Sequence, residues 1–327
     1  MLIRSTNLTQ PSFVYPTDYG QGSRGLWTGG GENYAPNNNY TNNTHYITIS
    51  TLGNSSLFGS CTSQLLGATG TSGRGRGIIS GGRVHTTPTN SISYLNIATP
   101  GDTTTFGNLN ATRQFAASAS NGTRGLILSG QIPYPNTAQV STVDYITIHT
   151  PANAGNFGNY VDSRYNRHGD AACSDGNYCI AMSEKSGQRY YDYWSISTLS
   201  DSTKWGDQRS GGVYEPEGPS CVSNTNRGVW CGGYDGGDSK KMDYLTFASQ
   251  GNATQFGELN QTVQYGGGVS DGSRGVVGGF TYRDPQPMIE YFSIDNAVGS
   301  AVVSANFGIV SGTGNGYRYM PAVYAGD

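Results

Sequence analysis

The chain of 327 residues is poor in charge and has no long hydrophobic run. Charged residues make up 13% of it, the formal net charge is -3, and no cluster of Lys and Arg stands out. Proteins that bind nucleic acid carry a basic patch, so we expect no nucleic-acid partner. No apolar run approaches the roughly 18 residues that would span a bilayer, so we expect no membrane insertion.

Cysteine is also scarce. The chain has five cysteines, and an odd number argues against a dedicated disulfide framework. Cys173 and Cys179 flank one turn, and Cys221 and Cys231 flank the corresponding turn about 50 residues later. Bridges within these pairs depend on strand register, which the sequence leaves open. Buried free thiols are favoured, because cysteine packs as a small apolar group.

What the chain does have is an internal repeat of about 50 residues. A tyrosine recurs at intervals of 48, 51, 48, 51 and 47 residues. A second aromatic, always followed by glycine, recurs in phase with it. The tyrosines are Tyr46, Tyr94, Tyr145, Tyr193, Tyr244 and Tyr291, and the second aromatics are Phe58, Phe106, Phe157, Trp205, Phe256 and Phe307. The chain therefore contains six copies of one unit.

A third marker, Arg-Gly, follows a turn in five of the units. It is found at Arg24-Gly25, Arg76-Gly77, Arg124-Gly125, Arg227-Gly228 and Arg274-Gly275. In the fourth unit Tyr178-Cys179 takes its place. Because these arginines are in phase with the repeat, we expect them to have a structural role, hydrogen bonding to carbonyl groups of neighbouring turns.

Each unit holds about four short strands bounded by turn residues and shows no helical periodicity, which predicts an all-β, six-bladed propeller. Residues 22–27 read as the second strand of a unit, and residues 322–327 read as a first strand. We therefore predict that the C-terminal strand completes the first blade, within one domain of residues 20–327. Residues 1–19 are expected to form an extended arm. The first strand of each unit is rich in Gly, Ala and Ser and is placed innermost.

We find no residues suited to catalysis, cofactor binding or metal binding. The histidines fall at unrelated positions of different units, without the spacing of a metal site. Gly73–Gly77 lacks the Gly-Lys-Ser/Thr ending of a phosphate loop. The innermost strands carry no paired carboxylates of the kind that glycosidases use. We therefore expect no cofactor and no enzymatic activity.

The loops after the second strand differ most between units and should gather on one face of the propeller, where function is commonly located. They are rich in tyrosine, which offers a large contact area with a polar tip and suits binding to proteins or sugars. Abundance of tyrosine alone is the competing explanation. The candidate partner-binding or glycan-binding residues are Tyr34, Tyr40, Tyr134, Tyr190, Tyr191, Tyr234 and Tyr282.

Each unit resembles a degenerate kelch repeat, with the fourth unit departing from the pattern at Met182-Ser183-Glu184. The kelch diglycine is matched by Thr28-Gly29-Gly30, Ser80-Gly81-Gly82, Cys231-Gly232-Gly233 and Val277-Gly278-Gly279. The phrases Asp243-Tyr244-Leu245-Thr246, Gly251–Gly257 and Ser270–Gly275 are similar to those of kelch-like structural proteins of tailed bacteriophages.

That resemblance implies a virion component of the tail, a fibre or the capsid surface, present in several copies. Other virion proteins, and a host surface glycan, would be its partners. The N-terminus lacks the apolar core of a secretory signal, so we expect assembly in the host cytoplasm and a final location in the virion. The alternatives are a glycan-active enzyme and a secreted, lectin-like propeller.

Overall fold

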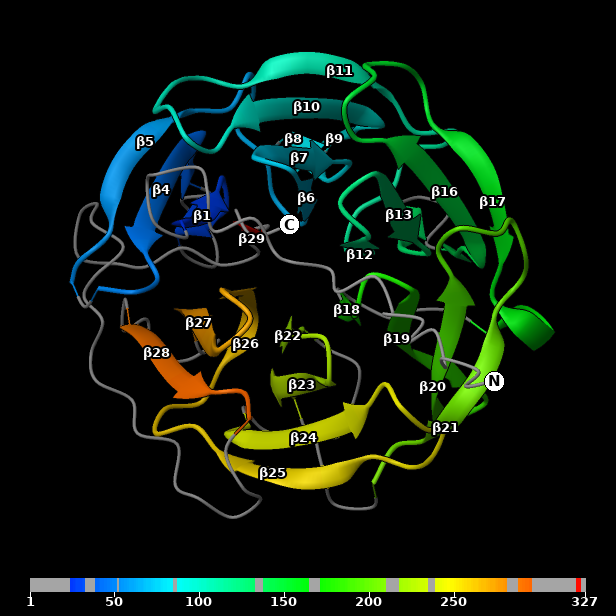
Figure 1. The fold of residues 1–327 in the computed structure, drawn as a ribbon. Helices are drawn as coiled ribbons and strands as arrows, with labels where there is room; N and C mark the ends of the chain where they lie inside the picture. Colours follow the sequence, from blue (N-terminus) through cyan, green and yellow to red (C-terminus); the bar gives the residue numbers. More distant parts are fainter. Residues whose placement is uncertain are drawn as a thin grey trace, which may run out of the picture.

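The computed structural model describes residues 24–32, 39–51, 53–84, 87–132, 138–164, 171–209, 218–234, 239–280, 288–295 and 322–324. Six antiparallel sheets are arranged around a common axis, as Figure 1 shows. The prediction of an all-β, six-bladed propeller is confirmed. The predicted arm, residues 1–19, lies outside the described residues.

The strands of each blade, from the axis outward, follow the order of the repeat except where the chain closes. Blade 1 consists of β29 (Ala322–Tyr324), β1 (Arg24–Thr28), β4 (Asn43–Thr48) and β5 (Ser56–Ser60). Blade 2 consists of β6 (Thr69–Gly73), β7 (Arg76–Ser80), β10 (Ser91–Asn96) and β11 (Thr104–Asn108). Blade 3 consists of β12 (Ala117–Ser120), β13 (Arg124–Leu128), β16 (Thr142–Thr147) and β17 (Gly155–Asn159).

The second half of the ring is built in the same way. Blade 4 consists of β18 (Ala172–Ser174), β19 (Tyr178–Lys185), β20 (Gln188–Ser195) and β21 (Thr203–Asp207). Blade 5 consists of β22 (Pro219–Ser223), β23 (Arg227–Gly232), β24 (Lys241–Thr246) and β25 (Thr254–Glu258). Blade 6 has three described strands, β26 (Gln264–Ser270), β27 (Arg274–Phe280) and β28 (Met288–Ser293).

The two ends of the chain close the ring. Strand β29 pairs antiparallel with β1, placing Tyr324 opposite Gly25, Val323 opposite Leu26 and Ala322 opposite Trp27. The C-terminal strand thus becomes the innermost strand of blade 1, as the sequence predicts. Pairing with β29 covers the inner edge of β1, which would otherwise present unpaired backbone groups.

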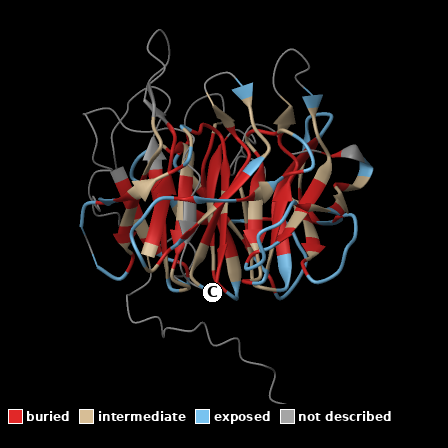
Figure 2. Cartoon of the chain, turned by 90° about the horizontal axis from the view of Figure 1, so that it is seen from above, coloured by how far each residue is buried: buried red, intermediate tan, exposed pale blue. Residues whose placement is uncertain are grey.

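The second strand of each blade lies in the core. Leu126, Ile127 and Leu128 of β13 are completely buried, because neighbouring blades cover both faces of the sheet. Figure 2 shows this buried layer running through the ring, with exposed residues at its rims. A strand buried on both faces reads in the sequence as a continuous apolar run rather than as an alternating pattern.

The two aromatic markers pack on each other in the five units where both are described. The tyrosine lies on the third strand and meets the second aromatic, on the fourth strand, edge to face. The ring centroids are 5.6 Å apart for Tyr46–Phe58, 6.1 Å for Tyr94–Phe106, Tyr145–Phe157 and Tyr244–Phe256, and 5.1 Å for Tyr193–Trp205. This contact within those five blades explains why the two markers stay in phase.

The glycine after the second aromatic lies where two blades meet. A Cβ atom on Gly206 of blade 4 would come within 1.9 Å of the carbonyl oxygen of Gly251 in blade 5. The next amide, of Asp207, donates to Asn252 Oδ1 at 2.9 Å. Equivalent bonds join Ser60 to Asp102, Asn108 to Asn153 and Asn159 to Asp201. Glycine is needed here because the neighbouring backbone approaches so closely.

The repeated arginine joins neighbouring blades, which confirms its predicted structural role. Arg76 of blade 2 lies over its own Tyr94, with the guanidinium carbon 4.4 Å from the ring centroid, and donates to the carbonyl of Ile148 in blade 3 at 3.0 Å. We call this pair of contacts the arginine clamp. Arg24, Arg124 and Arg274 repeat it, donating to Ala98, Ile196 and Ile49 respectively.

The diglycine forms a turn in some blades and not in others. Gly81 and Gly82 both have positive φ, of 65° and 89°, and Gly82 N donates to the carbonyl of Arg113 in the segment that leads to blade 3. Such φ values favour glycine. In blade 6 the matching Gly278 and Gly279 instead lie inside β27. Blade 4 replaces the turn with a long hairpin, whose two-residue loop is Ser186-Gly187.

Candidate functional site

The inner strands surround a cavity of about 130 Å³ on the axis. Its lining comes from β6, β12, β18, β22 and β26 and consists of Gly, Ala, Val, Ser, Thr and Cys side chains. This confirms that the small-residue strands are innermost. None of the described residues that line it carries a carboxylate, imidazole or amine. The cavity therefore offers hydroxyl and thiol groups rather than charge.

Most of those hydroxyl groups connect one blade to the next. Ser120 Oγ donates to the carbonyl of Ser72 at 2.5 Å, and Ser223 Oγ donates to that of Ser174 at 2.9 Å. Ser270 Oγ donates in turn to the carbonyl of Ser223 at 2.7 Å. These serines occupy equivalent positions near the end of each inner strand. The hydroxyl groups at the axis thus serve to hold the ring together.

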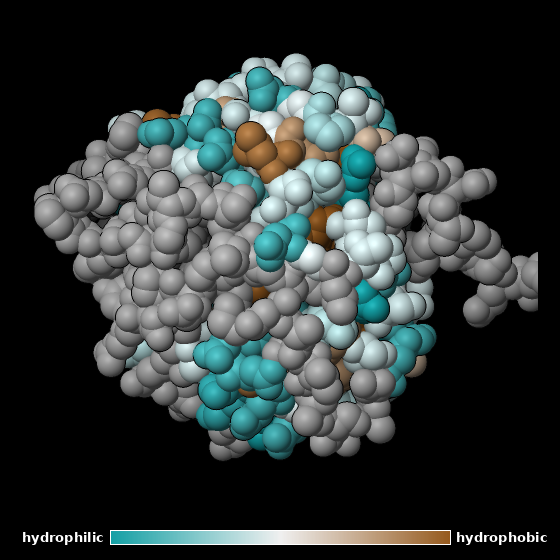
Figure 3. All heavy atoms as spheres, turned by 90° about the vertical axis from the view of Figure 1, so that its left-hand side faces the viewer, coloured by the Kyte–Doolittle hydropathy of each residue, from teal (hydrophilic) through white to brown (hydrophobic). Residues whose placement is uncertain are grey.

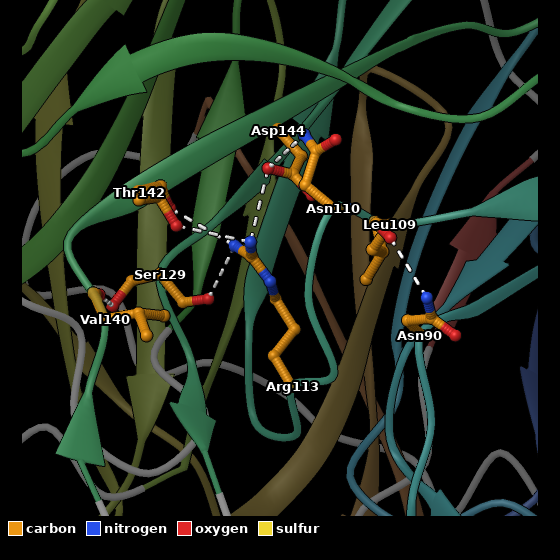
Figure 4. Close-up of polar contacts among 8 residues, drawn as sticks. All are labelled: Asn90, Leu109, Asn110, Arg113, Ser129, Val140, Thr142 and Asp144. Atoms are coloured by element: carbon orange, nitrogen blue, oxygen red, sulfur yellow. Dashed lines mark hydrogen bonds and ion pairs between the residues drawn. The ribbon is translucent and has the colours of Figure 1, made fainter.

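A buried ion pair lies in blade 3, where strand β13 ends and strand β16 begins (Figure 4). Arg113 and Asp144 are almost completely buried, with a nitrogen to oxygen distance of 3.2 Å. The guanidinium also donates to the carbonyls of Ser129 and Thr142, at 3.0 and 3.2 Å. Burial lowers the pKa of Arg113, and the charge of Asp144 opposes that shift. The pair ties the segment between blades 2 and 3 to β13 and β16.

Related ion pairs, each with a buried aspartate, follow in the next two blades. Arg164 and Asp192 are 2.6 Å apart in blade 4, and Arg209 and Asp243 are 2.8 Å apart in blade 5. Burial raises the pKa of Asp192 although Ser183 and Arg164 both contact its carboxylate. Sequence reasoning missed these pairs. The available signal was an acidic residue directly before the repeated tyrosine.

Blade 6 uses an acidic residue at the same place in a different way. The carboxylate of Glu290 accepts hydrogen bonds from the backbone amides of Asn260 and Gln261, at 2.9 and 2.8 Å. Burial raises the pKa of this carboxyl group. Val263 stands in the sequence where blade 3 has Arg113. The acidic groups of blades 3 to 6 are therefore engaged in contacts that hold linking segments in place.

Of the seven candidate tyrosines, Tyr34, Tyr134 and Tyr282 lie outside the described residues. Tyr40 lies on β3 (Asn39–Tyr40), which pairs with β2 (Gly31–Glu32) in a small hairpin beyond β1. Tyr234 is half-buried just after β23.

Tyr190 and Tyr191 lie on strand β20, which corrects their prediction as residues of the loop after the second strand. Tyr191 is completely buried, with its ring 4.6 Å from that of Trp230. Its prediction as a surface contact residue is wrong, because the long hairpin of blade 4 turns it inward. Tyr190 is partly exposed. The guanidinium of Arg164 lies 3.9 Å from the centre of its ring, and its hydroxyl donates to Gln188.

The connections after each second strand leave the ring at the same end, because the second strands are equivalent. They include the hairpins β2–β3, β8–β9 (Arg83–Val84 and Thr87–Pro88) and β14–β15 (Gln131–Ile132 and Ala138–Gln139), and the tip of β19–β20. Figure 2 shows short strands projecting from one face of the ring. We call this the hairpin face. Figure 3 views the ring from its side rather than onto this face, and the described residues visible there are mostly polar, with small hydrophobic spots between them.

The cysteines agree with the expectation of free thiols. All five are free, and four of them are buried. Cys179 lies opposite Ser174, and Cys231 lies opposite Ser220, so the register of β18–β19 and β22–β23 places neither predicted pair directly across. Among the described residues, no group of three or more His, Cys, Asp or Glu side chains could hold a metal ion. No helix in that part of the chain is long and apolar enough to cross a membrane.

No protein-family model matches the chain, and a search of curated proteins finds no similar one. The coordinates themselves establish a six-bladed propeller. The features of this propeller that bear on function are the contacts between its blades, the hydroxyl groups that line its axial cavity and the hairpin face.

Proposed function

We propose that this protein is a non-enzymatic component of a bacteriophage virion that serves as a rigid attachment module. Its hairpin face would contact neighbouring virion proteins or a host surface glycan. The observation that carries the proposal is the repeated joining of adjacent blades by arginine clamps, serine hydrogen bonds and close glycine contacts. A ring fastened in this way holds its loops in fixed relative positions, which lowers the ordering cost of binding.

The use of the buried charges supports a structural role. The ion pairs Arg113–Asp144 and Arg164–Asp192 are buried, Arg209–Asp243 has a partly exposed arginine, and all three fix linking segments. Catalytic carboxylates would instead face an open site with their charge available to a substrate. The kelch-like diglycines and the phage-like phrases in the sequence point in the same direction, towards a virion protein.

Tyr190 is the described residue best placed for a partner. It lies near the tip of the β19–β20 hairpin, and Arg164 and Lys204 lie against its ring at 3.9 and 5.1 Å. These contacts hold the aromatic ring in one orientation while leaving part of it exposed. A pre-positioned aromatic ring suits stacking on a sugar or packing against a protein.

Mass spectrometry of gradient-purified virions tests the location. We expect peptides of this chain in intact particles, in several copies per particle, and labelled antibodies should decorate the particles in electron microscopy. Presence in the infected lysate together with absence from purified particles would contradict the proposal.

Incubation of the protein with host polysaccharide tests the enzymatic alternative. We expect no released oligosaccharide, and product formation would favour a glycan-active enzyme instead.

Retention of the protein on virion proteins or on host glycan should weaken in the variant Tyr190→Ala. Leu199→Ala is the matched control, because Leu199 is 54% exposed in the turn at the opposite end of β20. Equal loss in both variants would argue against the hairpin face.

A further inference from the structure

Two thiols from different blades meet beside the axial cavity. Cys173 lies on β18 of blade 4, Cys221 lies on β22 of blade 5, and both line the cavity. Each points towards the other blade. The Cys173 sulfur lies so close to Gly228 of blade 5 that a Cβ there would be 2.3 Å away. Cys221 packs against the buried cluster that contains Cys173, and its thiol lies 3.7 Å from the carbonyl oxygen of Val222.

The neighbouring backbone holds these strands together. Ser223 Oγ, two residues beyond Cys221, donates to the carbonyl of Ser174, the residue after Cys173. A disulfide needs its Cβ atoms about 3.8 Å apart and its sulfur atoms about 2 Å apart. Cys173 and Cys221 lie in one cluster on strands joined in this way, so the bond requires their side chains to rotate about χ1 until the two sulfur atoms meet.

This interface also lacks the arginine clamp. Tyr178 replaces the arginine in blade 4 and packs edge-on against Tyr193, at 5.4 Å between ring centroids. Tyr178 therefore packs within its own blade. Near this place the hydroxyl oxygen of Tyr193 accepts a hydrogen bond from Gln250 Nε2 of blade 5, at 3.0 Å. A covalent bond at the axis would add the cross-link that this interface does not have.

We propose that Cys173 and Cys221 form an inter-blade disulfide when the protein meets a small peroxide oxidant. The Cys221 thiolate attacks one oxygen of hydrogen peroxide, the O–O bond breaks, and a sulfenic acid and hydroxide form. The Cys173 sulfur then attacks the Cys221 sulfur, the S–O bond breaks, and water leaves with the Cys173 thiol proton. Overall, two thiols and one peroxide give one disulfide and two waters.

Cys221 is the first thiol to react because it is the one described cysteine that is only partly buried, whereas the other four are buried. Burial raises the pKa of Cys221 well above its ordinary value. Since the thiolate is the nucleophile, oxidation is slow at neutral pH, and its rate rises about tenfold for each unit by which the pH increases while it stays below that pKa. The inference holds whether or not the protein is a virion component.

Peptide mapping of the full-length protein tests the pairing. The protein is treated with hydrogen peroxide, the remaining thiols are blocked with an alkylating reagent, and the digest is analysed by mass spectrometry without reduction. We expect one cross-linked peptide pair joining Cys173 to Cys221, lost on reduction. A disulfide to Cys179 or Cys231, or over-oxidation of Cys221 without any cross-link, would overturn the proposal.

Thermal unfolding of the oxidised and reduced protein gives a second readout. The bond would close a loop of 48 residues (221 minus 173), and loops of that size raise the melting temperature by roughly 5 °C or more in a domain of this length. The rise should persist in Cys61→Ser, whose thiol lies in blade 1, and vanish in Cys221→Ser. An unchanged or lower melting temperature on oxidation of the wild-type protein would contradict a stabilising bond.

Discussion

The interface between blades 3 and 4 and the interface between blades 4 and 5 join equivalent strands of the repeat. They do so through different side-chain interactions. At the first, Arg124 lies over Tyr145 and donates to the carbonyl of Ile196 at 2.8 Å. At the second, Tyr178 occupies the position of the arginine, and two thiols meet near the axis. The repeat therefore fixes where blades must meet, and not which interaction joins them.

Both interfaces contain a buried aromatic pair, and they differ in how its polar group is used. Tyr160 meets Trp194 between blades 3 and 4, with ring centroids 4.6 Å apart. Tyr191 meets Trp230 between blades 4 and 5 at the same distance. Trp230 Nε1 donates to the carbonyl of Ala171 at 3.1 Å, which ties its ring to the preceding blade. The interface without a clamp thus depends more heavily on its tryptophan.

The largest effect is expected from Trp230→Ala. Removing a buried tryptophan should lower the free energy of unfolding by about 3 to 5 kcal/mol. Trp194→Ala is the matched change at the other interface and should cost about 1 kcal/mol less, because no inter-blade hydrogen bond of the ring is lost with it. Urea unfolding of both variants measures the difference. A larger loss for Trp194→Ala would reverse the comparison.

The close glycine contacts should be equally important at both interfaces. A Cβ on Gly158 would lie 2.1 Å from the carbonyl oxygen of Ser200, and one on Gly206 would lie 1.9 Å from that of Gly251. Gly158→Ala and Gly206→Ala should each destabilise the fold by roughly 2 to 3 kcal/mol, because backbone must move to make room. Gly176→Ala is not a suitable control, since Gly176 has a positive φ. Gly251→Ala is suitable, because its Cβ would meet open space. A tolerated Gly206→Ala would show that the blades are not this close.

A smaller loss is expected when the clamp is removed. Arg124→Met keeps an apolar side chain of similar length and removes the charged donor to Ile196. Because the arginine is half-buried, we expect a loss of about 1.5 kcal/mol in chemical denaturation. Lysine at the same position should restore part of it, as a cation that can still donate. An unchanged stability in Arg124→Met would mean that the arginine clamp contributes little to holding the blades together and is only a sequence feature shared by the repeated units.

The smallest effect, and the only gain, is expected from placing the clamp where it is absent. In Tyr178→Arg the new guanidinium can lie over Tyr193 and donate to the carbonyl of Phe247, the counterpart of Ile196 in blade 5. We expect up to about 1 kcal/mol of added stability, because the site is at the surface. Tyr178→Leu is the control for loss of the aromatic contact alone. If the arginine variant is no more stable than the leucine variant, the interface has diverged too far to accept a clamp.

Much of this architecture could be predicted from the sequence. The repeated tyrosine, the aromatic with its glycine and the arginine are spaced by the geometry of one blade, so their phase gave the number of blades and the role of the arginine. The composition of residues 322–327 gave the closure. These features are local in the sequence or strictly periodic along it, and both kinds of feature can be recognised from the sequence alone.

The features that the sequence did not reveal depend on tertiary contacts. Tyr191 is followed by polar and aromatic residues and resembles a loop tyrosine, yet the extension of β19 and β20 turns it into the core. The partner of Asp144 is Arg113, which lies in an irregular linking segment outside the periodic part of the unit. The meeting of Cys173 and Cys221 depends on the angle between two blades. None of these contacts follows from the spacing of the residues alone.

Hydrogen exchange of the backbone amides, read by mass spectrometry on the intact protein, tests the closed ring most directly. If β29 completes blade 1, the amides of residues 322–324 and of β1 should exchange as slowly as those of the inner strands β6 and β12, and removing residues 321–327 should speed exchange throughout β1. Exchange of residues 322–324 at the rate of an unstructured peptide, with β1 unaffected by the truncation, would contradict a ring closed by its two ends.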